Sequence, residues 1–127
     1  MFEDAPKVEA AYFKKTGIFP IMHSIALRHD VWQTHPWIAR GLFKAFQRAK
    51  EDPYARLNDL SRYEISLAWF REPVSEQQQI LGDDPWPYGF EKNRHVVETL
   101  VGYLYEQGLA EKRVSVEKLF AANTLDL

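Results

Sequence analysis

Apolar residues recur every three or four positions along most of the chain, and this spacing predicts a mainly α-helical fold. A helix is expected to begin at Pro36 and to carry an apolar stripe as far as Ala49, with charged residues mostly on the opposite face. A second amphipathic helix is expected from Phe90 to Gln107, where Gly108 ends it. The pattern therefore predicts helices from residue 30 onward.

Shorter helices are predicted from their end signals. Residues 8–15 are expected to be helical, because Gly17 provides a favourable residue just after a helix end. Ser75 opens a sequence typical of a capping box, SEQQ, and Gly82 is expected to end the short helix that follows.

Prolines mark two further boundaries. Asp52 followed by Pro53 has the form of a helix cap and first helical residue, so the chain there either starts a second helix or continues the preceding one with a kink. Pro73 is expected to end this helix. Ser115 is expected to cap a last short helix.

Residues 18–27 differ from the rest because they are apolar at both odd and even positions. Such a segment predicts a β-strand buried on both faces, with Pro20 near its beginning or on an edge. A strand needs hydrogen-bonded neighbours, which could come from residues 110–116, from a second copy of the chain or from sequence outside it. The last two are the expected sources. The predicted fold class is mainly α with one or two strands near the N-terminus, in a single domain spanning residues 1–127.

Composition and charge exclude several classes of function. The 127 residues include 16 basic and 18 acidic side chains, a net charge of −2, and 46% are hydrophobic, as in a globular protein. This balance argues against a nucleic-acid partner, because phosphate binding needs a clustered cationic surface. The absence of cysteine excludes disulfides, a thiol nucleophile and iron–sulfur clusters. The start MFEDAPK has no signal-like apolar run and no segment is long enough to cross a membrane, so a cytoplasmic location is expected.

Aromatic residues make up 14% of the chain and are expected to fill the core or to line a site. His23 lies on one face of the predicted strand among apolar residues, where it is either functional or a hydrogen-bonded core residue. Arg28 follows at the carboxyl end of the strand, the end at which open α/β sheets tend to bind ligands; exposure to solvent is its alternative. His29 and His35 match no metal-ligand spacing, so no metal site is expected.

The segment GDDPWPYG, residues 82–89, combines charge, rings and stiff backbone. Asp84, Trp86 and Tyr88 offer a carboxylate and two rings with polar tips, held between prolines. The segment either contributes to a binding site or serves as a helix connector, in which Asp84 binds free amides and Trp86 fills the core. Arg94, in the following helix, either binds an anion or lies on an exposed polar face.

Three blocks of the sequence together resemble a known family. They are GIFPIMHSIALRHDVWQTHPWIARGLFKAFQRAK, GDDPWPYGFEKNRHVVETLVGYLYEQGL and VEKLFAANTLDL, and they are similar to the carboxyl-terminal part of the 4,5-dihydroxyphthalate decarboxylase family. The resemblance runs from about Tyr12 to the end of the chain. It implies the C-terminal portion of an α/β lobe like those of type II periplasmic-binding proteins, in which residues 18–27 form a crossing strand. Because two such lobes need roughly 200–300 residues, it also implies a fragment of a larger protein.

The resemblance also implies an activity and roles for site residues. Family members remove carbon dioxide from an aromatic dicarboxylate to give protocatechuate, which requires a proton donor for the ring carbon and cations for the other carboxylate. The matching positions make His23 the candidate proton-transfer residue, Arg28 a carboxylate partner, and Asp84, Trp86 and Tyr88 substrate-binding residues. The alternatives are a non-catalytic module that binds a small aromatic or carboxylate ligand, and an inactive fragment. No cofactor is expected, and the unpaired strand predicts a homo-oligomer.

Overall fold

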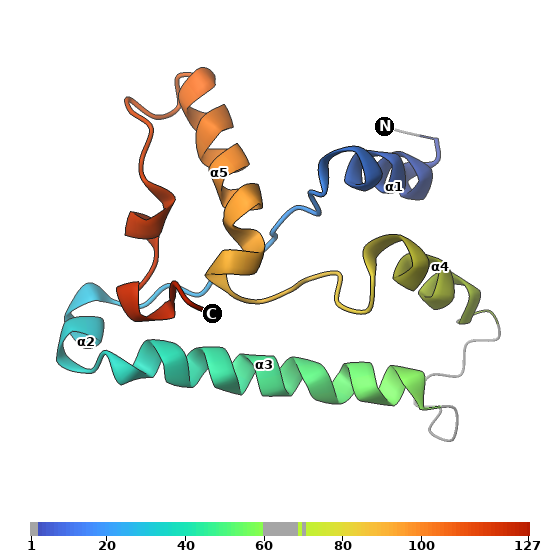
Figure 1. Cartoon of the computed structure of the whole chain (residues 1–127), viewed down its shortest axis with the longest axis horizontal. Coiled ribbons are helices and arrows are strands. Elements are labelled where there is room, and N and C mark those ends of the chain that lie inside the picture. Colours follow the sequence, from blue (N-terminus) through green and yellow to red (C-terminus); the bar gives the residue numbers. More distant parts are fainter. Residues whose placement is uncertain (1–2, 60–68, 70) are drawn as a thin grey trace. The chain divides into compact units, whose positions relative to one another are not determined.

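The computed structural model describes residues 3–59, 69 and 71–127, and this part of the chain is mostly helical (Figure 1). Its elements, in chain order, are α1 (Ala5–Thr16), α2 (His29–Thr34), α3 (Trp37–Asn58), α4 (Arg71–Leu81), α5 (Phe90–Glu106) and the 3-10 helices η1 (Val116–Leu119) and η2 (Ala122–Thr124). The predicted mainly α-helical character is confirmed.

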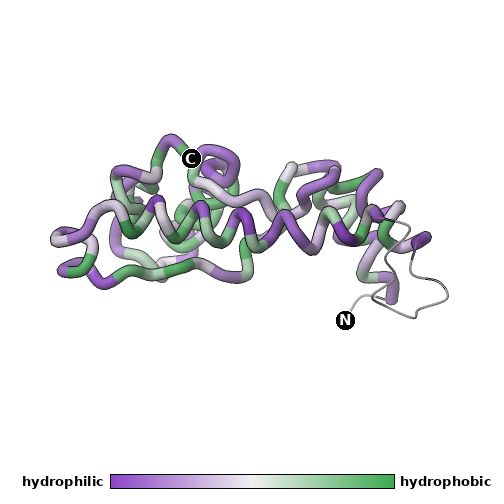
Figure 2. The backbone as a smooth tube through the Cα atoms, turned by 90° about the horizontal axis from the view of Figure 1, so that it is seen from below, coloured by the Kyte–Doolittle hydropathy of each residue, from purple (hydrophilic) through white to green (hydrophobic). Residues whose placement is uncertain are grey.

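Hydrophobic and hydrophilic residues are interspersed along the helices (Figure 2). This mixture is typical of helices that bury one face and expose the other. Among the described residues, no helix has the length and apolar character that crossing a membrane requires.

Contacts within the chain divide the described residues into two compact units. Unit 1 contains residues 3–22, 69 and 71–87, and unit 2 contains residues 23–59 and 88–127. Unit 1 therefore holds α1 and α4, whereas unit 2 holds α2, α3, α5 and both 3-10 helices. Each unit joins segments that are far apart in the sequence.

In unit 1, α1 packs against α4. The Asp4 side chain caps α1 by accepting a hydrogen bond from the Lys7 backbone N–H at 3.3 Å. Gly17 follows the helix in the left-handed region, at φ +67°, and its N–H donates to the Phe13 carbonyl at 2.7 Å. The predicted first helix and its end at Gly17 are confirmed.

The start of α4 corrects one expectation. The prediction that Pro73 ends a helix is wrong, because Pro73 lies in the first turn of α4, which begins at Arg71. A proline is tolerated there, since its missing N–H would have had no partner within the helix. Ser75 consequently lies inside α4 instead of capping it. Gly82 follows the end of α4 at φ +81°, as predicted.

In unit 2, α3 continues through Pro53. Of the two possibilities for this position, continuation of the preceding helix is therefore confirmed. Asp52 does not cap a new helix and instead forms an ion pair with Arg56 one turn later. The predicted helix beyond Asn58 falls largely on residues 60–68 and 70, which lie outside the described residues.

The core of unit 2 forms around Phe90, Val97 and Val116, each less than a tenth exposed. Val101 and Leu125 pack against this cluster. α5 contacts η1 and α3 contacts η2, so residues 116–124 join two helices that are distant in sequence.

The strand predicted at residues 18–27 is not confirmed. No strand occurs among the described residues, and residues 18–27 lack regular secondary structure up to their end. Ile21, Met22 and Ile25 are 45%, 67% and 63% exposed, whereas a strand buried on both faces would hide them. An apolar segment forms no ladder without a neighbour, and residues 110–116 form no strand either. The periplasmic-binding-protein-like lobe is likewise not confirmed.

Candidate functional site

The five predicted site residues fall in both units. Asp84 and Trp86 belong to unit 1, whereas His23, Arg28 and Tyr88 belong to unit 2. The structure therefore describes two sets of candidate residues, and each set is considered within its own unit.

Trp86 forms the aromatic part of the set in unit 1. Its ring lies against Phe19, with 5.3 Å between the ring centroids and 56° between the ring planes. Trp86 is 37% exposed, so it does not fill a core, although one of its contacts is a second ring. Pro85 is buried and Asp84 is half-buried. Unit 1 thus offers a partly open aromatic surface with a carboxylate two residues away.

Tyr88 contacts a cation that the sequence analysis did not single out. The ammonium nitrogen of Lys50, on α3, lies 4.2 Å from the centroid of the Tyr88 ring. Cation–π attraction at such a distance is worth about 0.5–1 kcal/mol at exposed sites. Tyr88 is 37% exposed and Lys50 is half-buried. The pair presents an aromatic ring and a positive charge side by side, the two features that an aromatic carboxylate would contact.

Lys50 was missed because its sequence signal is that of any residue on a polar helix face. It falls opposite the apolar stripe of α3, as does Lys44. Only the fold brings Lys50 to Tyr88, which lies far along the chain, and no spacing in the sequence distinguishes it from Lys44.

Arg28 is paired with a neighbouring carboxylate. Its Nε donates to Oδ1 of Asp30 at 3.1 Å and its Nη2 donates to Oδ2 at 2.6 Å. This hydrogen-bonded guanidinium lowers the pKa of the Asp30 carboxyl. The Arg28 side chain is 80% exposed, as the alternative interpretation of this residue expected. A substrate carboxylate would have to replace Asp30 in order to bind Arg28 in the same geometry.

His23 is exposed, so the interpretation of this residue as a buried core histidine is not confirmed. Within the described part of unit 2, no hydrogen bond or ion pair joins His23 to Arg28 or to Tyr88. The structure brings Tyr88 together with Lys50 and Arg28 together with Asp30. The catalytic role of His23 stays a prediction.

The first turns of α5 hold a network of opposite charges. Arg94 lies 3.0 Å from Glu91 and 3.7 Å from Glu98, and it also forms a close ion pair with Glu117. Hydrogen bonds to Glu117 and then Glu91 raise the pKa of Arg94. Glu117 accepts hydrogen bonds from the Ser115 hydroxyl and from Arg94, and these lower its pKa to about 2. Arg94 is thus surrounded by carboxylates, which disfavours the anion-binding role considered for it.

A surface hollow of about 290 Å³ lies beside this network. Its charged lining residues are Glu98, Glu117 and Arg113. Two carboxylates against one guanidinium make the lining acidic, which disfavours a dicarboxylate ligand. In the ranges that the structure describes, no group of three or more His, Asp or Glu side chains is placed to hold a metal ion.

Comparison with known proteins concerns the chain as a whole. No family model matches it. A protein named 4,5-dihydroxyphthalate decarboxylase, from Comamonas testosteroni, is 32% identical to it over 126 residues, which are 99% of this chain. The chain spans 38% of the length of that protein. This similarity supports a family relationship between the chain and 4,5-dihydroxyphthalate decarboxylase, over part of that protein's length.

Proposed function

We propose that this chain is part of a 4,5-dihydroxyphthalate decarboxylase, which releases carbon dioxide from an aromatic dicarboxylate and leaves protocatechuate. The observation that carries the proposal is the 32% identity over 126 residues to a protein of that name. The contact between Tyr88 and Lys50 supports it independently, because a ring beside an ammonium group suits an aromatic ligand that bears carboxylates.

The reaction replaces one carboxylate by a proton. The bond between the ring carbon and the carboxylate carbon breaks, carbon dioxide leaves, and the electron pair of that bond stays on the ring carbon. A general acid then delivers one proton to this carbon for each carbon dioxide released. His23 is the proposed donor, because an imidazole can act as a general acid and this side chain is exposed.

The carboxylate that remains on the ring needs a cation throughout the reaction. Lys50 is proposed for this role, because its ammonium group lies against Tyr88, the proposed aromatic wall in unit 2. Arg28 is a second proposed partner, provided that the substrate displaces Asp30.

Unit 1 holds the remaining two predicted site residues, and their roles are proposed within that unit alone. The part of the Trp86 ring that Phe19 leaves exposed is proposed to contact an aromatic ligand. The Asp84 carboxylate is proposed to accept a hydrogen bond from a ring hydroxyl, which increases the phenolate character of that ring.

The direct test is incubation of the purified chain with 4,5-dihydroxyphthalate labelled with carbon-13 in its carboxylates. We expect labelled carbon dioxide and protocatechuate in equal amounts, measured by mass spectrometry. His23→Gln should lower turnover by about 100-fold or more, as loss of a general acid does. His35→Gln, which removes another exposed histidine of unit 2, should retain turnover. Absence of product with the unsubstituted chain would overturn catalysis by this chain alone and would favour the inactive fragment.

Steady-state kinetics separates the role of Lys50 from that of His23. Lys50→Gln should raise KM by about tenfold and leave kcat nearly unchanged, because it removes an interaction present in both the ground state and the transition state. Lys44→Gln is the matched control, since Lys44 is exposed on the same helix. Binding of 4,5-dihydroxyphthalate without release of carbon dioxide would instead favour a non-catalytic module for small aromatic carboxylates.

A further inference from the structure

We propose that residues 121–127, here called the latch, position Tyr88 against Lys50. The consequence for ligand binding rests on the proposed function, because Tyr88 and Lys50 are its proposed binding residues. The latch runs from Ala121 through η2 to Leu127, and η2 contacts α3. Its contacts reach both the helix that carries Lys50 and the residue that follows Tyr88.

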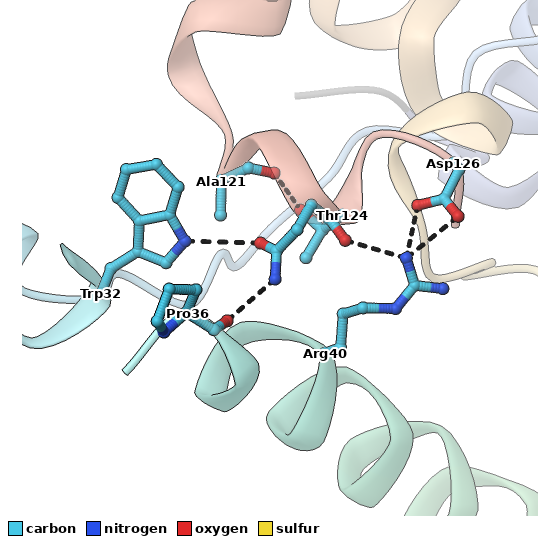
Figure 3. Close-up of polar contacts among 7 residues, drawn as sticks. Trp32, Pro36, Arg40, Ala121, Thr124 and Asp126 are labelled. Atoms are coloured by element: carbon cyan, nitrogen blue, oxygen red, sulfur yellow. Dashed lines mark hydrogen bonds and ion pairs between the residues drawn. The ribbon is translucent and has the colours of Figure 1, made fainter. Parts of the chain in front are cut away.

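Asn123 fastens the latch to α2 and to the start of α3, and Figure 3 labels its partners Trp32, Pro36 and Arg40. Its side-chain amide donates to the Pro36 carbonyl at 2.8 Å, and its side-chain oxygen accepts a hydrogen bond from the Trp32 indole N–H at 3.4 Å. Arg40 donates to the main-chain carbonyl of Asn123 at 2.9 Å. Asn123 therefore makes three hydrogen bonds: its side-chain amide donates one, its side-chain oxygen accepts one, and its main-chain carbonyl accepts one.

Arg40 adds an ionic contact to this attachment. Its Nη1 lies 2.7 Å and 3.0 Å from the two carboxylate oxygens of Asp126, as Figure 3 shows. This hydrogen bond lowers the pKa of Asp126. Between these anchors, the N–H and the hydroxyl of Thr124 both donate to the Ala121 carbonyl, at 2.8 Å and 2.7 Å. The latch is thus ordered internally and held on α3 at two positions.

At its other end the latch lies against Gly89. The Leu127 carbonyl accepts a hydrogen bond from the Glu91 N–H at 3.1 Å. Gly89 has φ +111° and ψ 150°, a conformation essentially restricted to glycine, and an added Cβ would lie 2.5 Å from the C and O atoms of Leu127. The side-chain amide of Asn93, on α5, donates a hydrogen bond to the Gly89 carbonyl at 2.8 Å. Because one peptide bond joins Tyr88 to Gly89, these contacts limit the movement of Tyr88.

The contacts together form a closed frame within unit 2. α3 carries both Arg40, which holds the latch, and Lys50, which contacts Tyr88. The helix between these two residues is a rigid span of about 15 Å. The latch connects α3 to Gly89, and one peptide bond connects Gly89 to Tyr88, so the ring of contacts is closed. A contact as weak as a single cation–π pair persists only where both partners are already held in place, and the latch holds one of them.

Amide hydrogen exchange of the unliganded chain tests the positioning role. Asn123→Ala removes two side-chain hydrogen bonds of the latch, and Gly89→Ala forces Leu127 out of its position. Each is expected to speed exchange at residues 89–91 by about tenfold, because local opening becomes easier there. The helical content measured by circular dichroism should stay unchanged.

Two substitutions elsewhere in unit 2 serve as matched controls. Gly108→Ala also places a Cβ at a positive φ, of +71°, but nothing lies within 4 Å of it. Asp30→Asn removes an exposed ion pair. Both should leave exchange at residues 89–91 unchanged. Exchange as in the unsubstituted chain for both Asn123→Ala and Gly89→Ala would overturn the positioning role.

A double-mutant cycle tests whether the latch affects binding through Tyr88. Calorimetric titration with phthalate, an aromatic dicarboxylate that lacks the two ring hydroxyls of the proposed substrate, measures the affinity. Asn123→Ala should weaken binding about tenfold in the otherwise unchanged chain and not at all in the Tyr88→Ala background. Equal losses in both backgrounds would overturn the link through Tyr88. A chain that does not bind phthalate would overturn the proposed function, while the exchange experiment would still decide the positioning role.

Discussion

Glu117 makes the stability of unit 2 depend on pH. Hydrogen bonds from Ser115 and Arg94 lower its pKa in the folded chain to about 2, from the ordinary value of 4.5. The unfolded chain therefore binds the proton first as the pH falls. The contribution of Glu117 to stability is fully present above about pH 4.5 and is lost as the pH falls towards about 2.

We expect Glu117→Gln to reduce the pH dependence of stability, because it removes one of the carboxylates whose pKa folding lowers. The measurement is the free energy of unfolding in urea at several pH values between about 2 and 6, the range in which the linkage operates. Glu111→Gln, an exposed position in the same unit, should keep the original dependence. A pH dependence that survives Glu117→Gln in full would mean that this carboxylate contributes nothing.

Tyr88, Arg28 and Lys50 differ in how far their roles and contacts could be predicted from the sequence. The family resemblance implied that Tyr88 is a substrate-binding residue, and this role stays a prediction, although the structure places the Tyr88 ring against Lys50. The partner of Arg28 is Asp30, only two residues away, so this pairing was within reach of the sequence. The contact of Lys50 with Tyr88 was not predictable from the sequence. It exists only after α3 and the residues before α5 meet in the fold.

α5 is an element whose ends are set by local signals. The sequence predicts a helix from Phe90 to Gln107, and the structure has one over Phe90–Glu106, with Gln107 as the residue that follows. Gly108 supplies the left-handed conformation, at φ +71°, that helix ends commonly adopt. These signals lie within a few residues of each boundary, and they can be interpreted without knowledge of the tertiary structure.

Residues 18–27 are the opposite case. Their apolar pattern indicates a need for burial, but a strand is defined by hydrogen bonds to a second segment. The described residues contain no such segment, and Ile25 and its apolar neighbours are exposed. A single sequence does not identify a partner for a strand, so the strand that the pattern predicted is not confirmed.

Two prolines provide a matched test of helix α3. Pro53 lies inside α3, where proline costs about 3 kcal/mol relative to alanine because it removes a hydrogen bond and crowds the preceding turn. Pro73 lies in the first turn of α4, where little is lost. We expect Pro53→Ala to raise the free energy of unfolding by about 1–3 kcal/mol, after the larger entropy of the unfolded chain is included. Pro73→Ala should change it by less than about 1 kcal/mol.

Urea unfolding followed by circular dichroism measures both variants. Pro53→Ala should also increase the helical signal of the folded chain. Equal changes for the two variants, or a loss of stability in Pro53→Ala, would contradict the assignment of Pro53 to a helix interior.

For the whole molecule, exposed apolar side chains predict self-association. Ile21, Met22 and Ile25 are largely exposed in one continuous segment, and contiguous apolar surface is commonly covered by another protein surface. We expect sedimentation velocity at micromolar concentration to show a species larger than the monomer, and Ile25→Lys to reduce it. Leu109→Lys, at a position that is 71% exposed, should not. A monomer at every concentration would contradict this prediction.

Length and composition indicated that the chain can fold, but not how its contacts would be distributed. The structure groups residues 23–59 with residues 88–127 in unit 2. No local pattern signals such a grouping, because an apolar stripe shows which helix face is buried and not what covers it. The single domain over residues 1–127 and its two-lobed parent therefore stay predictions.

The latch also has a consequence for biosynthesis. Its hydrogen bonds to Trp32 and Arg40 join residues 91 and 83 positions apart. A ribosome exposes α3 before residues 121–127 emerge, so the surface of α3 that the latch covers stays open until they are synthesised. Contacts this distant also slow folding, because a long loop must close before they form. That open surface of α3 is thus accessible to a chaperone that acts on nascent chains until the latch is synthesised.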